Sequence, residues 1–276
     1  MKKCGYIAVL GETNAGKSTL VNCLVGQKVS IVSRKVQTTM SRILGIAIEG
    51  ESQIILADTP GFVSNRQSEV LEKISWEASR EAVCVLFLVD VNKSNLDKSI
   101  ALLQKIPADK KVTLVLNKVD LIHKPKLLGI ADRLCKERDS DQVFMVSSLN
   151  GSGVGDLKKY LADIVPEGEW EFDADEITDS DFAKYTSEIT REHLYHRVHQ
   201  EIPYQCKVVT TSYEEKPNGK IFIEQDILVK SVAHRIILVG QGGSKLKAIG
   251  SAAREELSKL LGKAINLKLN VVVESK

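Results

Sequence analysis

Residues 11–18 read Gly-Glu-Thr-Asn-Ala-Gly-Lys-Ser, which fits the pattern G-x-x-x-x-G-K-S/T. The stretch follows a short apolar run, Tyr6 to Leu10, and precedes a helical pattern that begins near Lys17. A strand before the loop and a helix after it are the context that this pattern requires. Its glycines let backbone N–H groups curl around phosphate oxygens, and the helix N-terminus adds the positive end of its dipole. The sequence therefore predicts a phosphate-binding loop.

Two side chains of this loop have expected roles of their own. Lys17 should reach the β- and γ-phosphates of a nucleotide, and the Ser18 hydroxyl should ligate Mg²⁺. The residues expected to contact the nucleotide from this loop are Gly11, Glu12, Thr13, Asn14, Ala15, Gly16, Lys17, Ser18 and Thr19.

The first 165 residues alternate strand-length apolar runs with stretches of helical spacing. Two of these runs, 43–48 and 53–57, flank Gly50, which predicts an antiparallel hairpin. Three later runs, 83–89, 112–116 and 143–146, are apolar on both faces, as a buried and mostly parallel sheet requires. Together they predict a three-layer α/β domain that ends near Pro166.

The tetrapeptide Asn117-Lys118-Val119-Asp120 at the end of the run 112–116 predicts which base is read. A carboxylate accepts two hydrogen bonds from guanine, at N1–H and at the exocyclic N2 amine. Adenine would leave such a carboxylate unpaired, and mismatches of this kind give strong rejection. We therefore expect Asp120 to read guanine, Asn117 to tie this turn to the phosphate loop, and Lys118 to lie along the base. GTP is favoured over ATP.

Three other segments complete the predicted nucleotide site. Asp58-Thr59-Pro60-Gly61 ends the run 53–57, so Asp58 is placed to hold Mg²⁺ through water and Gly61 to offer a backbone N–H to the γ-phosphate. Ser147-Ser148-Leu149 follows the last strand and is placed to contact guanine O6 through backbone N–H groups. Thr38 or Thr39 should complete the Mg²⁺ shell, and the sequence does not choose between them.

The C-terminal part has a different pattern. An acidic stretch leads to a helix that extends to about residue 201, with Thr178, Asp179 or Ser180 as the expected cap. Two strands, 206–213 and 221–229, join through Pro217-Asn218-Gly219, a turn that accepts positive φ. A short run then leads to Gly240-Gln241-Gly242-Gly243, a helix to about residue 261 and a strand over 265–273.

Charge is distributed unevenly although the whole chain carries only +2. Residues 1–166 contain 23 Lys and Arg against 18 Asp and Glu, 167–201 contain 3 against 11, and 202–276 contain 12 against 7. A basic excess on the small C-terminal unit is compatible with an anionic partner and equally with ordinary solvated surface charge.

Composition excludes several classes of protein. The chain has 276 residues, 43% hydrophobic and 27% charged, which is typical of a folded globular chain with two unequal domains. Its longest apolar run, 82–89, is far shorter than the roughly 18 residues of a membrane span. The five cysteines are scattered without paired spacing, which argues against disulfides or a zinc site and for a reducing compartment.

The order and type of the nucleotide motifs over residues 5–165 resemble the translation-factor-like GTPases. Phe62 stands where Ras-like proteins carry the glutamine that orients the attacking water, and a phenyl ring cannot do this, so slow hydrolysis is expected. Several GTPases with a hydrophobic residue there use a potassium ion near the phosphate-loop asparagine, here Asn14. The resemblance therefore implies K⁺ beside Mg²⁺ as a cofactor.

The C-terminal elements resemble a type II KH domain, with its GxxG loop between two helices. Such a loop is poor in side chains so that backbone N–H groups can approach RNA phosphates. We expect RNA contacts from Gly240, Gln241, Gly242, Gly243, Lys245 and Lys247. GxxG alone also fits a plain helix–helix turn.

A GTPase domain followed by a KH domain is the architecture of the Era family of bacterial GTPases, which the whole chain resembles. Matching segments include Gln37-Thr38-Thr39, Phe62 and Glu201-Ile202-Pro203-Tyr204. Departures are Glu12-Thr13 for the usual Arg-Pro, Met40 for arginine and Ser148 for alanine.

The resemblance implies a GTPase domain over 1–168, an acidic linker and inter-domain helix over 169–201, and a KH domain over 202–276. It also implies binding to the 3′ end of small-subunit ribosomal RNA, a role in 30S assembly, and a monomeric cytoplasmic protein with peripheral membrane contact. The alternative is a GTPase switch of tRNA modification or metal transport whose C-terminal unit contacts protein.

Overall fold

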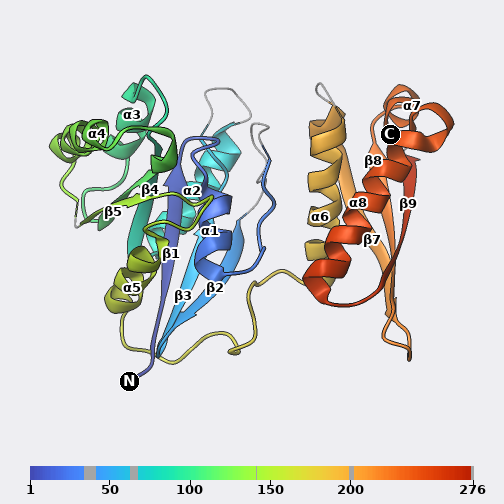
Figure 1. The fold of residues 1–276 in the computed structure, drawn as a ribbon, viewed down its shortest axis with the longest axis horizontal. Helices are drawn as coiled ribbons and strands as arrows, with labels where there is room; N and C mark the ends of the chain where they lie inside the picture. The colour runs from blue at the N-terminus through green and yellow to red at the C-terminus, as the bar shows by residue number, and fades with distance from the viewer. Residues whose placement is uncertain (34–41, 63–67, 141, 199–201, 275–276) are drawn as a thin grey trace. The chain divides into compact units, whose positions relative to one another are not determined.

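The chain folds into two compact units, Met1–Asp179 and Ser180–Lys276. The structure is a computed structural model and describes residues 1–33, 42–62, 68–140, 142–198 and 202–274. Figure 1 shows the elements of both units. In the described part of the chain, no helix is long and apolar enough to cross a membrane.

The first unit is built on one mixed sheet, in the order β2-β3-β1-β4-β5-β6 among the described residues. All neighbours are parallel except β2 and β3, which form the predicted antiparallel hairpin. The strands are β1 (Lys3–Gly11), β2 (Ile43–Glu49), β3 (Ser52–Asp58), β4 (Cys84–Asp90), β5 (Val112–Asn117) and β6 (Gln142–Val146). The helices are α1 (Lys17–Val25), α2 (Ser68–Glu81), α3 (Asp97–Gln104), α4 (Lys124–Glu137) and α5 (Val154–Ile164).

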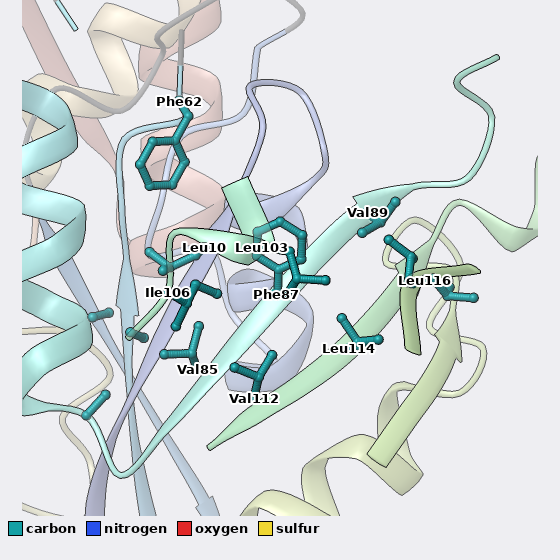
Figure 2. Close-up of a cluster of buried hydrophobic side chains, with 14 of the residues drawn as sticks. Leu10, Phe62, Val85, Phe87, Val89, Leu103, Ile106, Val112, Leu114 and Leu116 are labelled. Carbon is teal, nitrogen blue, oxygen red and sulfur yellow. The ribbon is translucent and has the colours of Figure 1, made fainter. Parts of the chain in front are cut away.

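Helices cover both faces of this sheet, which confirms the three-layer α/β fold. Alternate residues of each strand point to opposite faces, so β4 sends Phe87 to a core under α2, α3 and α4, and Leu86 to a core under α1 and α5. Figure 2 shows Phe87 in the first core beside Leu103 and near Leu10. Burial on both faces explains why these strands are continuously apolar.

The acidic stretch before the second unit lies along the first sheet. The side chain of Gln53 is fully buried. Its Oε1 accepts hydrogen bonds from the backbone N–H groups of Glu171 and Phe172 at 2.9 and 3.1 Å, and its Nε2 donates to the Phe172 carbonyl at 2.8 Å. Further along, Ile46 N–H donates to the Ile177 carbonyl. The predicted linking segment 169–201 is therefore divided, with 169–179 on the first unit and the rest in the second.

The second unit has the element order of a type II KH domain, which confirms that part of the predicted fold. Its elements are α6 (Phe182–Arg197), β7 (Cys206–Glu215), β8 (Ile221–Val229), α7 (Val232–Val239), the short turn η3 (Gln241–Gly243), α8 (Ser244–Leu261) and β9 (Ile265–Val273). β8 lies between β7 and β9, antiparallel to the first and parallel to the second. Leu194, Leu238 and Ile249 are buried in the core between the helices and this sheet.

One sequence expectation about α6 is wrong. The cap is Asp181, whose Oδ1 accepts a hydrogen bond from Lys184 N–H at 2.6 Å, and not Thr178, Asp179 or Ser180. The reason is that the preceding residues are held by β2: Thr178 bridges to Gly45, and the Asp179 carboxylate accepts from Leu44 N–H at 3.0 Å.

Candidate nucleotide-binding site and nucleic-acid interface

The phosphate-binding loop leaves β1 at Gly11 and enters α1 at Lys17. Gly11 and Gly16, at the two ends of the loop, lie so close to other atoms that a side chain would not fit at either position. A Cβ at Gly11 would lie 2.5 Å from the Leu88 carbonyl oxygen, and a Cβ at Gly16 would lie 2.3 Å from Asn117 Nδ2. Gly16 also has φ 100°, and no described side chain caps α1 there. The helix therefore presents backbone N–H groups toward the loop, as phosphate binding requires.

Lys17 is the buried cation of this loop. Its Nζ donates to the carbonyl oxygens of Gly11 and Glu12 at 3.1 and 3.0 Å. Burial lowers the pKa of this ammonium group to about 8, and the nearby Asp58 charge opposes the effect. Burial disfavours the charged form of the Lys17 ammonium group. A bound anion would offset this cost and stabilise the charged form.

The segment after β3 lies directly against this loop. Asp58 is fully buried at the end of β3, and Thr59 Oγ1 donates to the Val9 carbonyl at 2.7 Å. A Cβ at Gly61 would come within 2.6 to 2.9 Å of Thr13, so only glycine fits between them. One pocket is lined by residues of the loop, by the segment 31–33 and by Gly61, namely Thr13, Asn14, Gly16, Lys17, Ser18, Thr19, Ile31, Val32, Ser33 and Gly61.

Phe62 faces the hydrophobic core. Its ring is buried beside Trp76, with ring centroids 5.1 Å apart, and Figure 2 shows it above Leu10. A buried phenyl group has no hydrogen bond to offer a water molecule, so slow hydrolysis remains the expectation.

Asn117 joins three loops at the carboxyl end of the sheet. Its Nδ2 donates to the Ala15 carbonyl at 2.8 Å, and its Oδ1 accepts from the Ser148 N–H and hydroxyl at 3.0 and 2.9 Å. The link from Asn117 to the phosphate loop is the one expected from the sequence. The Ser148 hydroxyl strengthens the same junction.

Lys118 makes a second connection. Its Nζ donates to the Asn14 carbonyl at 2.8 Å and pairs with the Asp90 carboxylate at 2.5 Å. Sequence reasoning missed Asp90. The available signal was its position as an acidic residue at the end of a buried strand, at the edge of the sheet where ligands bind in α/β folds.

The remaining predicted base contacts lie around Asn117. Asp120 is exposed at the start of the turn after β5. Ser147 is buried, its N–H donating to the Ser152 carbonyl, whereas the Leu149 side chain is 84% exposed. The side chain of Glu12 turns away from the loop toward Lys93 and Ser99, so a nucleotide contact by Glu12 would come from its backbone. Thr38 and Thr39, together with Met40, lie outside the described residues.

The GxxG loop of the second unit has the backbone that RNA-phosphate contact needs. Gly240, Gly242 and Gly243 have φ values of 73°, 58° and 76°, a region that side chains disfavour. Nothing lies within 4 Å of a Cβ built at Gly242 or Gly243, so the surface there is open. α8 begins immediately after the loop without a side-chain cap among the described residues.

A groove extends from this loop between α8 and β9. It is lined by Gly243, Leu246, Lys247, Gly250, Ser251, Arg254, Leu267 and Leu269. Sequence reasoning placed Lys247 here but missed Arg254 and the leucines. The signal was available, because residues 247, 250, 251 and 254 share one face of a helix by their spacing.

Comparison with known proteins identifies both units. The model of the 50S ribosome-binding GTPase family matches residues 6–118, and the KH domain model matches residues 201–276. GTPase Era of Erythrobacter litoralis is 43% identical over 100% of this chain and 93% of its own length. GTPase Era of Caulobacter vibrioides is 43% identical over 99% of this chain and 92% of its own.

Two solved structures agree with these relatives. An Era in complex with MgGDPNP and nucleotides 1506–1542 of 16S ribosomal RNA matches with a TM-score of 0.91 and 33% identity, covering 100% of this chain and 95% of that one. A variant of Aquifex aeolicus Era bound to GDP and AlF4⁻ gives the same TM-score and identity over 99% of this chain and 95% of its own. With full-length relatives and a GTPase domain ahead of a KH domain, this chain belongs to the Era family of GTPases.

Proposed function

We propose that this GTPase binds the 3′ end of small-subunit ribosomal RNA through its KH unit and assists assembly of the 30S subunit. The groove beside the GxxG loop is the observation that carries the proposal. It combines an open, glycine-rich backbone with an apolar floor that includes Leu246 and Leu269, and with two cations, Lys247 and Arg254. KH domains use these features to hold single-stranded nucleotides. The related Era with bound 16S ribosomal RNA supports the assignment.

The test changes two glycines of the loop. Replacing Gly242-Gly243 by Asp-Asp should lower affinity for a single-stranded 16S 3′-end fragment at least about tenfold, because carboxylates repel phosphates that must approach the backbone closely. RNA affinity is measured by fluorescence anisotropy at fixed salt, and GTP affinity is measured in parallel and should stay unchanged.

The matched control is Asn-Asn at the same two positions. Asparagine has the same shape as aspartate and tolerates positive φ, so it separates charge from backbone strain and should lose less affinity. Unchanged RNA affinity in the Asp-Asp protein would contradict the proposal. That result would favour a GTPase switch of tRNA modification or metal transport whose C-terminal unit contacts protein.

We propose that Ser18 ligates Mg²⁺ and that Asp58 holds the ion through water, with Thr38 or Thr39 completing the shell. A hydroxyl and a carboxylate are the hard oxygen ligands that Mg²⁺ prefers, and the related Era binds Mg²⁺ with its nucleotide. The ion would neutralise charge on the phosphates. Lys17 and the Gly61 N–H would stabilise charge that develops on the γ-phosphate. The nucleotide contacts predicted from the sequence at residues 11–19, 58–62, 117–120 and 147–149 are part of the same proposal.

We also propose that K⁺ supports hydrolysis beside Asn14. Asn14 is exposed at the lip of the nucleotide pocket, and its φ of 62° is unusual for a residue with a side chain. GTP turnover should be on the order of tenfold faster in KCl than in NaCl of equal ionic strength, as expected for added positive charge near the transferring phosphate. Asn14→Ala should abolish the difference. Equal rates of the unaltered protein in the two salts would rule out this role.

Family membership supports a proposal for the domain limits and the cellular setting. We propose a GTPase domain over 1–168 and a KH domain over 202–276, joined by residues 169–201. We propose further that the protein acts as a cytoplasmic monomer with peripheral contact to the cytoplasmic face of the membrane. GTP and Mg²⁺ would alter how the KH unit is presented to RNA.

A further inference from the structure

The Glu12 carboxylate forms a charged cluster behind the phosphate-binding loop, in which the Glu12 side chain is 12% exposed and the Lys93 side chain 33% exposed. Its Oε2 accepts from Lys93 Nζ at 2.7 Å, and its Oε1 accepts from the Ser99 hydroxyl. Lys93 belongs to the loop between β4 and α3, and Ser99 lies in the first turns of α3, where it is buried. Burial alone would raise the pKa of this carboxyl, but the hydrogen bonds from Lys93 and Ser99 outweigh it and lower the pKa. The carboxylate is thus held in its charged form.

The backbone of Glu12 contacts the reacting end of the site. Its carbonyl oxygen accepts from Lys17 Nζ at 3.0 Å. Its backbone also pairs with that of Phe62 as a parallel bridge. The next residue, Thr13, packs so closely on Gly61 that a Cβ there would overlap it. Glu12 therefore joins α3, the phosphate loop, Lys17 and the start of the segment after β3.

We propose that Glu12, anchored by Lys93 and Ser99, is a positioning residue for GTP hydrolysis that sets where Lys17 and the Gly61 N–H lie relative to the γ-phosphate. Ion pairs that are mostly buried hold geometry tightly, because breaking one leaves an uncompensated charge.

The arrangement predicts an effect on turnover more than on binding. GDP has no γ-phosphate, so the positions of Gly61 and Phe62 matter little for its affinity. On the proposed nucleotide site, the α- and β-phosphates would be contacted by the backbone around Gly16, which Asn117 holds independently through Ala15. Misplacing catalytic groups by a fraction of an ångström costs rate even when substrate still binds.

The experiment measures GTP kcat, GTP KM and GDP affinity for Glu12→Gln, Lys93→Met and the exchanged pair E12K/K93E. Each single variant should lower kcat about tenfold, with KM and GDP affinity within about threefold of the unaltered protein. The two single effects should not add when Glu12→Gln and Lys93→Met are combined, because they break one interaction. The exchanged pair should recover kcat to within about threefold, since it restores the pair in reverse.

The control is Lys105→Met, an exposed lysine at the C-terminal end of α3, which should leave kcat unchanged. Thermal unfolding of each nucleotide-free variant separates folding from positioning. The inference would be overturned by single variants that lose thermal stability while kcat per folded molecule stays the same, or by single variants whose loss is confined to KM and GDP affinity. Additive effects of Glu12→Gln and Lys93→Met would also overturn it.

Discussion

Asp120→Asn should reverse the base preference of the protein from guanine to xanthine. The Asp120 carboxylate can accept from guanine N1–H and from the N2 amine, whereas xanthine carries a carbonyl oxygen in place of that amine. An asparagine amide can accept from N1–H and donate to this oxygen, so it pairs with xanthine and leaves guanine mismatched. Unpaired polar groups in a recognition site cost a factor on the order of 10³ or more, so the GTP-to-XTP affinity ratio should fall by at least that factor.

Displacement of a fluorescent nucleotide by GTP and by XTP measures the ratio directly. Asp109→Asn is the matched control, because Asp109 is an exposed acidic residue of the same unit in the turn before β5, and it should change neither affinity. If Asp120→Asn still prefers GTP, the base is read by another group, and the expected role of Asp120 is wrong.

The α/β fold was predictable because its signals are local. Strands such as β4 and β5 are buried on both faces, so nearly every position is apolar. A continuous apolar run of strand length is therefore a clear signal of such a strand in the sequence. Gly16 occupies a position where a Cβ would overlap Asn117 and where φ is positive, so only glycine fits there. Its place next to Lys17 in the motif identifies the phosphate-binding loop. The cap of α6 was not predictable in the same way. Thr178 and Asp179 are good caps by composition, and only tertiary pairing with β2 assigns them elsewhere.

The candidate site was predictable where chemistry depends on residue type and spacing, and not where it depends on partners distant in sequence. The link from Asn117 to the phosphate loop could be predicted from the tetrapeptide alone, and the role of Asp120 stays a prediction. The Glu12 anchor could not, because Lys93 is 81 residues away and Ser99 is 87 residues away. A lysine in a loop and a serine in a helix carry no signal until the fold places them against one carboxylate. Arg254 in the KH groove could have been predicted from helical spacing, because it lies on the same helix face as Lys247.

Asn117→Asp should be among the most damaging single-atom changes in the first unit. The side chain of Asn117 is 1% exposed, donates from Nδ2 to the Ala15 carbonyl and accepts at Oδ1 from Ser148. Aspartate keeps the acceptor but replaces the donor by a carboxylate oxygen that faces the Ala15 carbonyl. A buried charge with a lost hydrogen bond should lower the free energy of unfolding by about 3 kcal/mol or more. Because Ala15 belongs to the phosphate loop, GDP affinity should fall more than about a hundredfold.

Asn150→Asp is a control that isolates the donor. Asn150 is exposed in the loop after β6 and uses only its Oδ1, which accepts from Ser152 N–H at 3.0 Å among the described contacts. Aspartate supplies that acceptor equally well, so the free energy of unfolding should stay within about 0.5 kcal/mol. Urea unfolding and GDP titration of both variants make the comparison. If the two variants behaved alike, the hydrogen bond from Asn117 to Ala15 would not be what joins base recognition to the phosphate loop.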